Sequence, residues 1–328
     1  MIFPIIFASI YGNICIEWGE VQSVGQMDPI INESSGLVML ADGSLLTHND
    51  SGDGPVLYRI SQSGVLLQTI ELDGAVAVDW ESLTSGPCGE ETCVFVADVG
   101  DNGAARQSVT IFRFPVRALM TEEPATVIVD YTSLEVIYPD GPRDCETIAV
   151  DPMSEAIVFV EKIPKGEARW YTLKPEAWQG PEPAELAYGG LMDTGADSFT
   201  GGWMTGGDFE PSGTILWTRT YPQGFGWSVR RGVDREIEGF DYLVDFEIPL
   251  NEQCESLTVS PDGEKLWLSC EGRDGVLASA GCISFAERQG YPETDEDDSS
   301  NQGCATGTAA IWWLLLAFSL VPRTPRTL

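Results

Sequence analysis

The sequence predicts an all-β fold, and in particular a β-propeller of five blades. Short segments with one common pattern recur along the chain, at a spacing that suits four-stranded blades with loops of varying length. Gly and Pro bound runs of roughly four to eight apolar or alternating residues, as strands require. The body of the chain shows no convincing amphipathic helix. A two-sheet sandwich is the weaker alternative, because sandwiches lack this recurrence.

Each repeated segment begins with an acidic residue, continues with small and apolar residues, and then reaches a turn that a strand-like run follows. The segments begin 47–65 residues apart. Their first residues are Glu33, Glu81, Glu146, Asp208 and Glu255. The last unit is too short for a whole blade, so we expect residues 17–24 to complete it and close the ring. The longer units leave room for a sixth blade.

The two ends of the chain predict export and attachment to a membrane. Residues 1–15 are largely apolar and match a secretory leader, although no basic residue precedes Arg59 and a buried first strand is the alternative. We expect residues 16–290 to form the propeller and residues 291–303 to form an acidic spacer that cannot bury enough apolar surface to fold. Residues 304–328 contain an apolar stretch just long enough to cross a bilayer, followed by a basic tail.

The sequence around this last stretch has a recognisable arrangement. Gly303 and Cys304 stand directly before it, and Arg323 and Arg326 follow it. The arrangement resembles the tripartite C-terminal sorting signals of Gram-negative bacteria, especially the myxobacterial type with a Gly-Cys pair. The resemblance implies that a sorting protease removes the helix and that Cys304 is modified for attachment at the outer surface. A plain single-pass anchor is the alternative, and release of the protein is a further outcome.

The chain is strongly acidic, with 51 Asp and Glu against 18 Lys and Arg and a net charge of −33. This charge repels a phosphate backbone, because nucleic-acid binding needs clustered cations. We therefore expect no nucleic-acid partner. Most of the acidic side chains are expected to form a solvated surface.

Eight cysteines in an exported chain suggest disulfides rather than metal ligation. Cys88 and Cys93 are close enough in sequence to close a tight loop between two strands. Cys270 and Cys282 are expected to bracket a turn near the end of the domain. Cys15 would be lost with the leader.

In a propeller the first strand of each blade lines the central channel, so a repeated acidic residue at its start predicts a ring near one mouth. Carboxylates that meet there repel one another, and a hard cation such as Ca²⁺, bound by about six to eight oxygens, is the simplest remedy. The structural alternative is that these side chains cap turns and accept backbone N–H groups. The expected metal ligands are Glu33, Asp50, Asp79, Glu81, Asp98, Asp101, Glu146, Asp208 and Glu255. The expected ligand-binding residues around them are Asn49, Asn102, Arg143, Lys162 and Tyr221.

Catalysis at this mouth would depend on few residues. His48 is the only histidine, which excludes zinc sites with several histidines. Asp79 and Glu81 would share one face of a strand and could serve as acid and base, although alternation alone places them there. The catalytic candidates are Asp79, Glu81, His48 and Arg219.

A second resemblance rests on a combination of motifs: His-Asn-Asp-Ser-Gly at 48–52, Asp-Trp-Glu at 79–81, Asp-Val-Gly-Asp-Asn at 98–102, Thr-Gly-Gly-Asp at 205–208, and Cys-Glu-Ser-Leu-Thr at 254–258. Together they resemble a group of largely uncharacterised secreted bacterial propellers, distantly similar to phytase-like and TolB-like propellers. Phytase-like relatives imply calcium-dependent hydrolysis of phosphoesters. Those enzymes bring several Lys and Arg to their phosphates, and this chain offers few.

Two functions from different classes follow from these observations. The first is a surface-displayed binding or scaffold propeller, with Ca²⁺ at the channel and a small molecule, glycan or protein as its ligand. The second is a calcium-dependent hydrolase that acts on phosphoesters, lactones or glycosides through carboxylates at the channel mouth. Cation-dependent melting without turnover would favour the first, and turnover that depends on Asp79 or Glu81 would favour the second.

Overall fold

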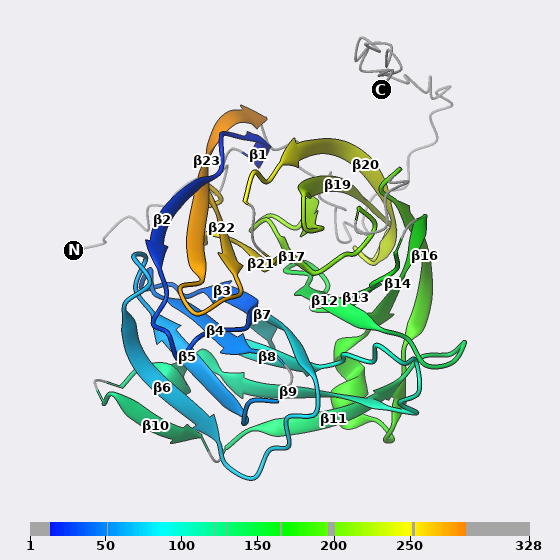
Figure 1. The fold of residues 1–328 in the computed structure, drawn as a ribbon. Coiled ribbons are helices and arrows are strands. Elements are labelled where there is room, and N and C mark those ends of the chain that lie inside the picture. Colours follow the sequence, from blue (N-terminus) through cyan, green and yellow to red (C-terminus); the bar gives the residue numbers. More distant parts are fainter. Residues whose placement is uncertain are drawn as a thin grey trace, which may run out of the picture. The chain divides into compact units, whose positions relative to one another are not determined.

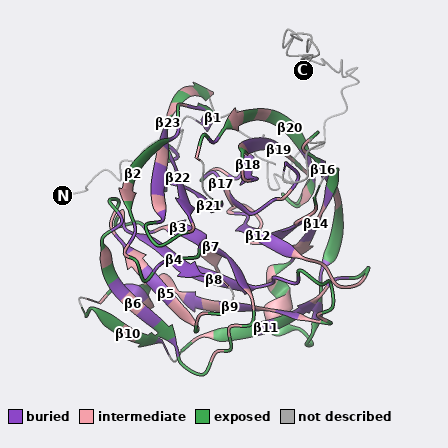
Figure 2. Ribbon diagram, viewed as in Figure 1, coloured by how far each residue is buried: buried purple, intermediate pink, exposed green. Residues whose placement is uncertain are grey.

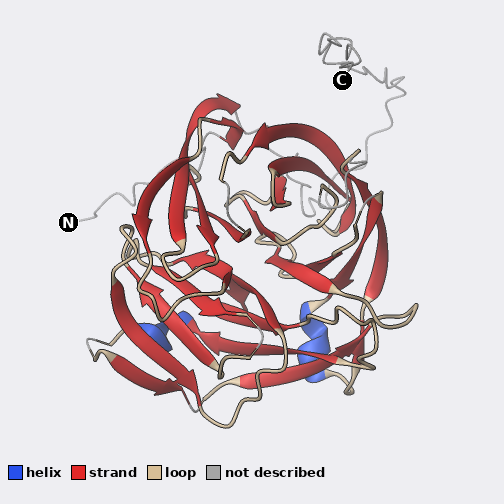
Figure 3. Ribbon diagram, viewed as in Figure 1, coloured by secondary structure: helices blue, strands red, loops and turns tan. Residues whose placement is uncertain are grey.

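The computed structural model describes residues 14–50, 52–121, 123–128, 130–164, 166–195, 201–250 and 253–286. These residues form five β-sheets arranged around a common axis, with only two short 3₁₀ helices outside them (Figures 1 and 3). The five-bladed, all-β propeller expected from the sequence is therefore confirmed. The expected spacer, apolar segment and Cys304 lie outside the described residues, among which no helix is long and apolar enough to span a bilayer.

Each blade is a mainly antiparallel sheet whose first strand lies innermost. Blade 1 contains β3 (Ser34–Met39), β4 (Leu45–Asn49), β5 (Val56–Ile60) and β6 (Leu66–Leu72), with β10 (Ala125–Ile128) added in parallel to β6. Blade 2 contains β7 (Trp80–Cys88), β8 (Glu91–Asp98), β9 (Val109–Pro115) and β11 (Thr132–Ile137), with β15 (Ala184–Glu185) added in parallel to β11. Blade 3 contains β12 (Cys145–Val150), β13 (Ile157–Glu161), β14 (Glu167–Leu173) and β16 (Ala187–Asp193).

The other two blades and the helices complete the described chain. Blade 4 contains β17 (Gly206–Phe209), β18 (Ile215–Arg219), β19 (Gln223–Arg231) and β20 (Ile237–Glu247). Blade 5 contains β21 (Cys254–Val259), β22 (Lys265–Cys270) and β23 (Val276–Ala286), together with β1 (Ile14–Trp18) and β2 (Gln22–Gln26). The helices are η1 (Val116–Leu119) and η2 (Pro175–Gln179).

The N-terminal strands close the ring. Both β1 and β2 pair antiparallel with β23, and Cys15 forms a disulfide with Cys282 across that pairing. The expected completion of the last blade by residues 17–24 is confirmed. Ile14 and Cys15, expected in the leader, instead belong to β1, because they pair with Ala286 and Phe285.

The other cysteines correct one expectation and confirm another. Cys88 and Cys93 form the expected disulfide. Cys270 pairs with Cys254 rather than with Cys282, because the two residues lie directly opposite each other in neighbouring strands. Cys145 is buried and carries a free thiol.

The hydrophobic core lies between the blades rather than inside any one of them. Five clusters of buried apolar side chains occur, one for each pair of neighbouring blades, and burial is continuous around the ring (Figure 2). Trp80, Trp217 and Trp227 are among the largest fully buried side chains. Burying a large apolar side chain stabilises a fold by roughly 1.5–3 kcal/mol, so the blades hold one another in place mainly by this packing.

The innermost strands contact one another in ring order, β3 to β7, β12, β17, β21 and back to β3. Side chains near their ends fasten neighbouring blades. Thr84 Oγ1 accepts a hydrogen bond from the Val150 N–H at 3.4 Å, and Thr258 Oγ1 accepts one from the Met39 N–H at 3.4 Å. These bonds fix the height of each inner strand relative to the next.

Candidate metal centre at the channel mouth

A β-bulge positions a side chain at the same place in four of the five inner strands. The pairing register shifts at Glu81 in β7, Glu146 in β12 and Glu255 in β21, and at Ser35 and Gly36 in β3. A bulge inserts one extra residue, bends the strand and re-aims a side chain. Three glutamates on three blades are thereby brought together at one mouth of the channel.

These three carboxylates form a compact buried group. Oxygen atoms of Glu81, Glu146 and Glu255 all lie within 4.8 Å of one another, and the three side chains belong to residues that are only 2%, 2% and 3% exposed. Glu146 Oε2 and Glu255 Oε2 are buried without a hydrogen-bond partner among the described residues. Buried acceptors without donors are costly, so this arrangement calls for an additional positively charged or hydrogen-bonding group.

Neighbouring side chains neutralise or hydrogen-bond these three carboxylates only in part. Lys162 forms an ion pair with Glu146 Oε1, and the Tyr221 hydroxyl donates to Glu255 Oε1 at 2.7 Å. Ser35 Oγ is 3.4 Å from Glu81 Oε2 and donates to the Glu81 carbonyl at 2.8 Å. One ammonium therefore faces three buried carboxylates.

Three half-buried carboxylates extend the group toward solvent. Asp50 and Asp79 lie within 4.8 Å of Glu81, and Asp50 and Glu271 lie equally close to Glu255. Asp50 and Glu271 directly follow the second strands of their blades, the position that Lys162 holds in blade 3. Five carboxylates besides Glu146 therefore line this mouth, in overlapping groups of three.

Gly100 leaves room for these side chains. A Cβ atom at this position would lie 2.4 Å from Asp79 Oδ2 and 2.6 Å from Glu81 Oε1. Only a glycine allows the two carboxylates to come so close to this backbone. The site therefore requires glycine at position 100.

The carboxyl groups at this mouth hold protons more tightly than usual. Burial, and next the charge of Glu146, raises the pKa of Glu81 well above its ordinary value; burial, and next the charge of Glu255, does the same to the pKa of Glu146. Burial and the neighbouring Glu255 raise the pKa of Glu271 to about 8. Burial raises the pKa of Asp79 as well. A bound cation would reverse these shifts, because it stabilises the ionised form.

Lys162 stays positively charged despite its burial. Desolvation opposes its charge, but Glu146, Glu255 and Glu81 outweigh that effect and raise the pKa of Lys162. Its ammonium also lies 5.1 Å from the ring centre of Trp203, whose ring packs edge-on against Tyr221 at 5.6 Å. The mouth thus combines carboxylates, one cation and two aromatic rings.

Two of the five residues expected in the ring are not members of it. In blades 3 and 5 the ring glutamate lies five residues before the residue that opens the turn, and the same spacing falls at Ser35 in blade 1 and at Thr205 in blade 4. Glu33 is exposed and two residues too early, and its N–H donates to Asn49 Oδ1 at 3.1 Å. Asp208 is three residues too late and lies toward the opposite mouth. The sequence alignment of these two residues with the glutamates was wrong, because it followed the acidic residue rather than the turn.

Other expected ligands have structural partners. Asp98 forms an ion pair with Arg106 at 2.7 Å and accepts from the N–H groups of Val78 and Asp79 at 2.9 and 3.1 Å. Asp101 accepts from the N–H groups of Ala105 and Arg106 at 2.9 and 2.8 Å. Both carboxylates therefore stabilise the loop after β8.

Of the five residues expected to bind a small molecule, two lie at the carboxylate group and three do not. Lys162 and Tyr221 lie at the carboxylate group, as described above. Asn49 is buried and bonds to the Ile30 carbonyl and Asp53. Asn102 is exposed, and Arg143 forms an ion pair with Asp140 at 2.8 Å.

Two catalytic candidates are enclosed by protein. His48 is fully buried, its Nδ1 lies 2.8 Å from the Asn49 carbonyl, and burial lowers its pKa to about 4. Arg219 is fully buried and donates to the carbonyls of Thr220, Ser256 and Tyr221, and burial lowers its pKa to about 9. These contacts assign the two side chains to the scaffold beneath the mouth.

The structure adds Glu271, Ser35, Thr205 and Gly100 to the mouth. Glu271 could have been found from its place directly after a strand, which matches that of Asp50. Thr205 and Ser35 carry no acidic signal and emerge only when the turns are aligned. Thr205 Oγ1 is buried without a hydrogen-bond partner among the described residues, like the two glutamate oxygens.

Comparisons with known proteins give no family assignment. No protein-family model matches the chain, and no curated protein matches it in sequence. Among solved structures, one described as U3-55K is 10% identical in sequence, with a TM-score of 0.42. The match covers 80% of this chain and 98% of the U3-55K chain. A putative 6-phosphogluconolactonase from Bacteroides uniformis is 14% identical, covers 76% of this chain and 69% of its own, and has a TM-score of 0.40. Both likenesses are too distant to assign an activity.

Proposed function

We propose that this protein is a ligand-binding propeller that holds Ca²⁺ at the channel mouth formed by Glu81, Glu146 and Glu255. The observation that carries the proposal is the pair of buried oxygens, Glu146 Oε2 and Glu255 Oε2, that have no hydrogen-bond partner among the described residues. They belong to a three-carboxylate group within 4.8 Å, and bulges in three separate blades aim it at one point.

Charge balance supports a divalent ion. Three buried carboxylates and the ammonium of Lys162 leave two negative charges when all four groups are ionised; the nearby guanidinium of Arg219 offsets only part of the charge that Asp50, Asp79 and Glu271 add. A divalent cation neutralises this remainder. Burial of uncompensated charge is otherwise among the most costly arrangements in a protein.

The donor atoms support Ca²⁺ over a transition metal. Every candidate ligand in the group is a carboxylate oxygen, and Asp50, Asp79 and Glu271 add further oxygens nearby. Hard oxygen donors suit Ca²⁺, which accepts about six to eight of them in a flexible geometry. The bound ion would leave Lys162, Tyr221 and Trp203 at the rim to contact a polar ligand.

Calorimetry on the purified protein tests this proposal. After removal of metals with a chelator, we expect Ca²⁺ to bind with one site and to raise the melting temperature. Glu255→Gln should weaken Ca²⁺ binding by at least about 10–100-fold, the loss typical of changing even a supporting residue of a metal site. Glu135→Gln, at an exposed carboxylate on the outer strand β11, is the matched control and should bind Ca²⁺ normally. Absence of binding heat with Ca²⁺, Mg²⁺ and Mn²⁺ would refute the cation site.

Hydrolysis is the second candidate function, and one observation favours it. Glu81 combines a raised pKa with a half-buried carboxylate neighbour, Asp79, at a solvent-facing mouth, an arrangement that suits a general acid beside a base. A panel of phosphoesters, lactones and glycosides, assayed with Ca²⁺ and with chelator, tests it. Turnover that Asp79→Asn abolishes without a change in melting temperature would favour the hydrolase over the binding module.

The proposed location is the cell exterior, with attachment through the C-terminal segment. It is supported by three disulfides, by the acidic composition and by the resemblance of residues 303–326 to a sorting signal. Mass spectrometry of the native protein tests it. A processed C-terminus at Cys304 is expected, whereas an unmodified chain that ends at Leu328 in the soluble cytoplasmic fraction would contradict it.

A further inference from the structure

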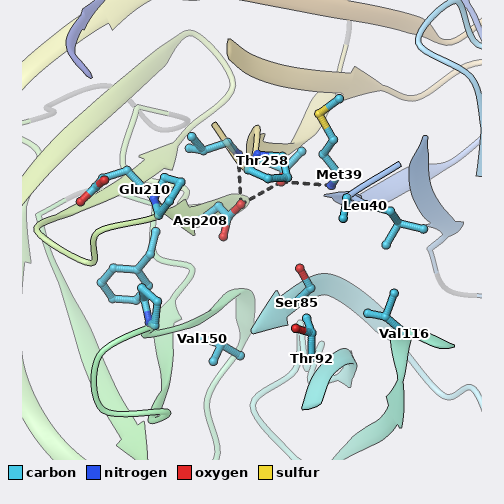
Figure 4. A pocket seen from close by; sticks show the side chains of 15 residues that line it. Met39, Leu40, Ser85, Thr92, Val116, Val150, Asp208, Glu210 and Thr258 are labelled. Atoms are coloured by element: carbon cyan, nitrogen blue, oxygen red, sulfur yellow. Dashed lines mark hydrogen bonds between the residues drawn. The ribbon is translucent and has the colours of Figure 1, made fainter. Parts of the chain in front are cut away.

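A cavity lies at the opposite mouth of the channel from the three glutamates. Its volume is about 380 Å³, and all five blades contribute residues from the turn-side ends of their inner strands. This volume falls in the lower part of the range of roughly 300–1,000 Å³ found for small-molecule sites. Figure 4 shows Asp208, Thr258, Ser85 and Val150 around one open space.

The lining is largely apolar, with the hydroxyls of Ser85, Thr92 and Thr258 and one carboxylate, that of Asp208, facing the space. Met39, Val150, Val259 and Phe209 contribute apolar surface, and Pro152, Pro211 and Pro261 occupy equivalent turn positions at the rim. Glu210 also lines the cavity, but its oxygens accept bonds from Ser212 and Thr214 within its own turn. Asp208 is thus the acidic group that remains for a ligand.

Asp208 performs a structural task that does not need its charge. Its Oδ2 accepts from the Val259 N–H at 3.0 Å and from Thr258 Oγ1 at 2.8 Å. Thr84 and Thr258, at the equivalent positions of blades 2 and 5, accept the corresponding N–H groups of Val150 and Met39 with a neutral hydroxyl. Threonine is therefore sufficient for fastening one blade to the next.

The charge of Asp208 is left without a protein counter-ion. Among the described residues, no Lys or Arg forms an ion pair with it. Desolvation raises its pKa to about 7, which reflects the cost of the uncompensated charge in apolar surroundings. A metal ion does not fit, because one carboxylate in an apolar wall cannot supply the oxygens that Ca²⁺ or Mg²⁺ requires.

We propose that this cavity binds a small organic ammonium ion, whose charged nitrogen pairs with Asp208 and whose apolar body fills the space between Met39, Val150 and Val259. An ammonium head supplies the missing counter-ion, and its hydrocarbon part replaces water on the apolar wall. This site is separate from the proposed cation centre, because Asp208 lies three residues further along its strand than the ring position at Thr205.

Binding of phenethylamine, with phenethyl alcohol as its neutral partner, tests the proposal by calorimetry on the purified protein above the pKa of about 7. The amine is expected to bind at least about tenfold more tightly than the alcohol. Asp208→Thr should remove this preference, because it keeps a hydroxyl for the Val259 N–H and deletes the charge. Asp208→Asn, which keeps the shape of the side chain, provides the same test if the threonine variant does not fold.

Two readouts separate this proposal from the cation centre. Ca²⁺ binding by the Asp208→Thr protein should equal that of the unaltered protein, so failure of one site leaves the other testable. The ammonium site is refuted if amine and alcohol bind equally, if the Asp208 variants keep the preference, or if neither phenethylamine nor hexyltrimethylammonium binds.

Discussion

A β-bulge disrupts the hydrogen-bond ladder of a strand, and this chain accepts that disruption at the same place in four inner strands. The gain is a side chain aimed at the channel axis. Glutamate occupies this position in blades 2, 3 and 5, and serine occupies it in blade 1. Thr205 stands at the matching place in blade 4. The backbone therefore repeats more faithfully than the side chains do, and the chemistry of the mouth depends on which residue each bulge presents.

Asp208 should make stability depend on pH. Its pKa is raised to about 7, so the folded protein binds this proton more tightly than the unfolded chain does. The free energy of unfolding should therefore fall as pH rises from about 4 to about 7 and level off above that. Asp208→Asn should remove this dependence on pH, because the amide carries no charge that burial can penalise. Above that range the variant should be more stable by on the order of 2 kcal/mol, less than the full pKa shift implies, since the cavity keeps part of the carboxylate hydrated.

Urea denaturation of both proteins across this pH range measures the effect. The informative quantity is the difference in unfolding free energy between the two proteins at each pH, since other carboxyl groups contribute equally to both. A difference that stays constant with pH would contradict the assignment.

Among the structural elements, the hairpin of β21 and β22 supplies two of the six carboxylates at the mouth. Glu255 and Glu271 each follow a half-cystine of the Cys254–Cys270 disulfide, which joins the two strands at that height. We expect the Cys254→Ser/Cys270→Ser protein to bind Ca²⁺ about tenfold more weakly, because the two carboxylates lose a fixed separation. The measurement is calorimetry under the same conditions as for the unaltered protein.

The Cys88–Cys93 disulfide gives a matched control. It joins the far end of the β7–β8 hairpin, near the turn between Cys88 and Glu91 and away from Glu81. Cys88→Ser/Cys93→Ser should leave Ca²⁺ affinity unchanged even where it lowers the melting temperature. Equal loss of affinity in both double variants would show that the effect is one of general stability.

Blades 3 and 4 are joined by a fully buried ion pair. Arg231 on β19 donates to both oxygens of Asp151 at 2.7 Å, and both side chains are wholly inaccessible. Arg231→Met should lower the free energy of unfolding by about 3–5 kcal/mol, because it leaves a buried charge without its partner. Urea denaturation checks this, and recovery of most of the loss in Arg231→Met/Asp151→Asn would identify the unpaired carboxylate as the cause.

The sequence predicted some elements of the fold much better than others. Glu81, Glu146 and Glu255 could be aligned because each precedes a similar run of small and apolar residues and a turn. Ser35 and Thr205 could not, since a bulge is a backbone feature that different side chains occupy. The Cys254–Cys270 bond was missed for a related reason: it depends on which residues face each other across two strands, and strand register is not evident from spacing alone.

For the whole molecule, the disulfide between Cys15 and Cys282 should contribute more than the others to stability. It links residues 267 positions apart, and a cross-link restricts the unfolded chain more as the closed loop grows longer. Cys15→Ser/Cys282→Ser should therefore lose roughly 4 kcal/mol of unfolding free energy. Guanidinium denaturation measures the loss, and a smaller loss than that of Cys88→Ser/Cys93→Ser would contradict the expectation.

The pairing of β1 and β2 with β23 also delays the folding of blade 5 until the end of the propeller has been synthesised. At a synthesis rate of roughly 5–20 residues per second, the first strands exist for tens of seconds before their partner has been made. During that interval blade 5 cannot form, and the apolar surfaces of blades 1 and 4 that face it stay uncovered. A ribosome that stalls short of residue 276 therefore yields an incomplete ring of blades with an exposed apolar surface at each end. Such incomplete rings are prone to associate with one another through these surfaces instead of closing.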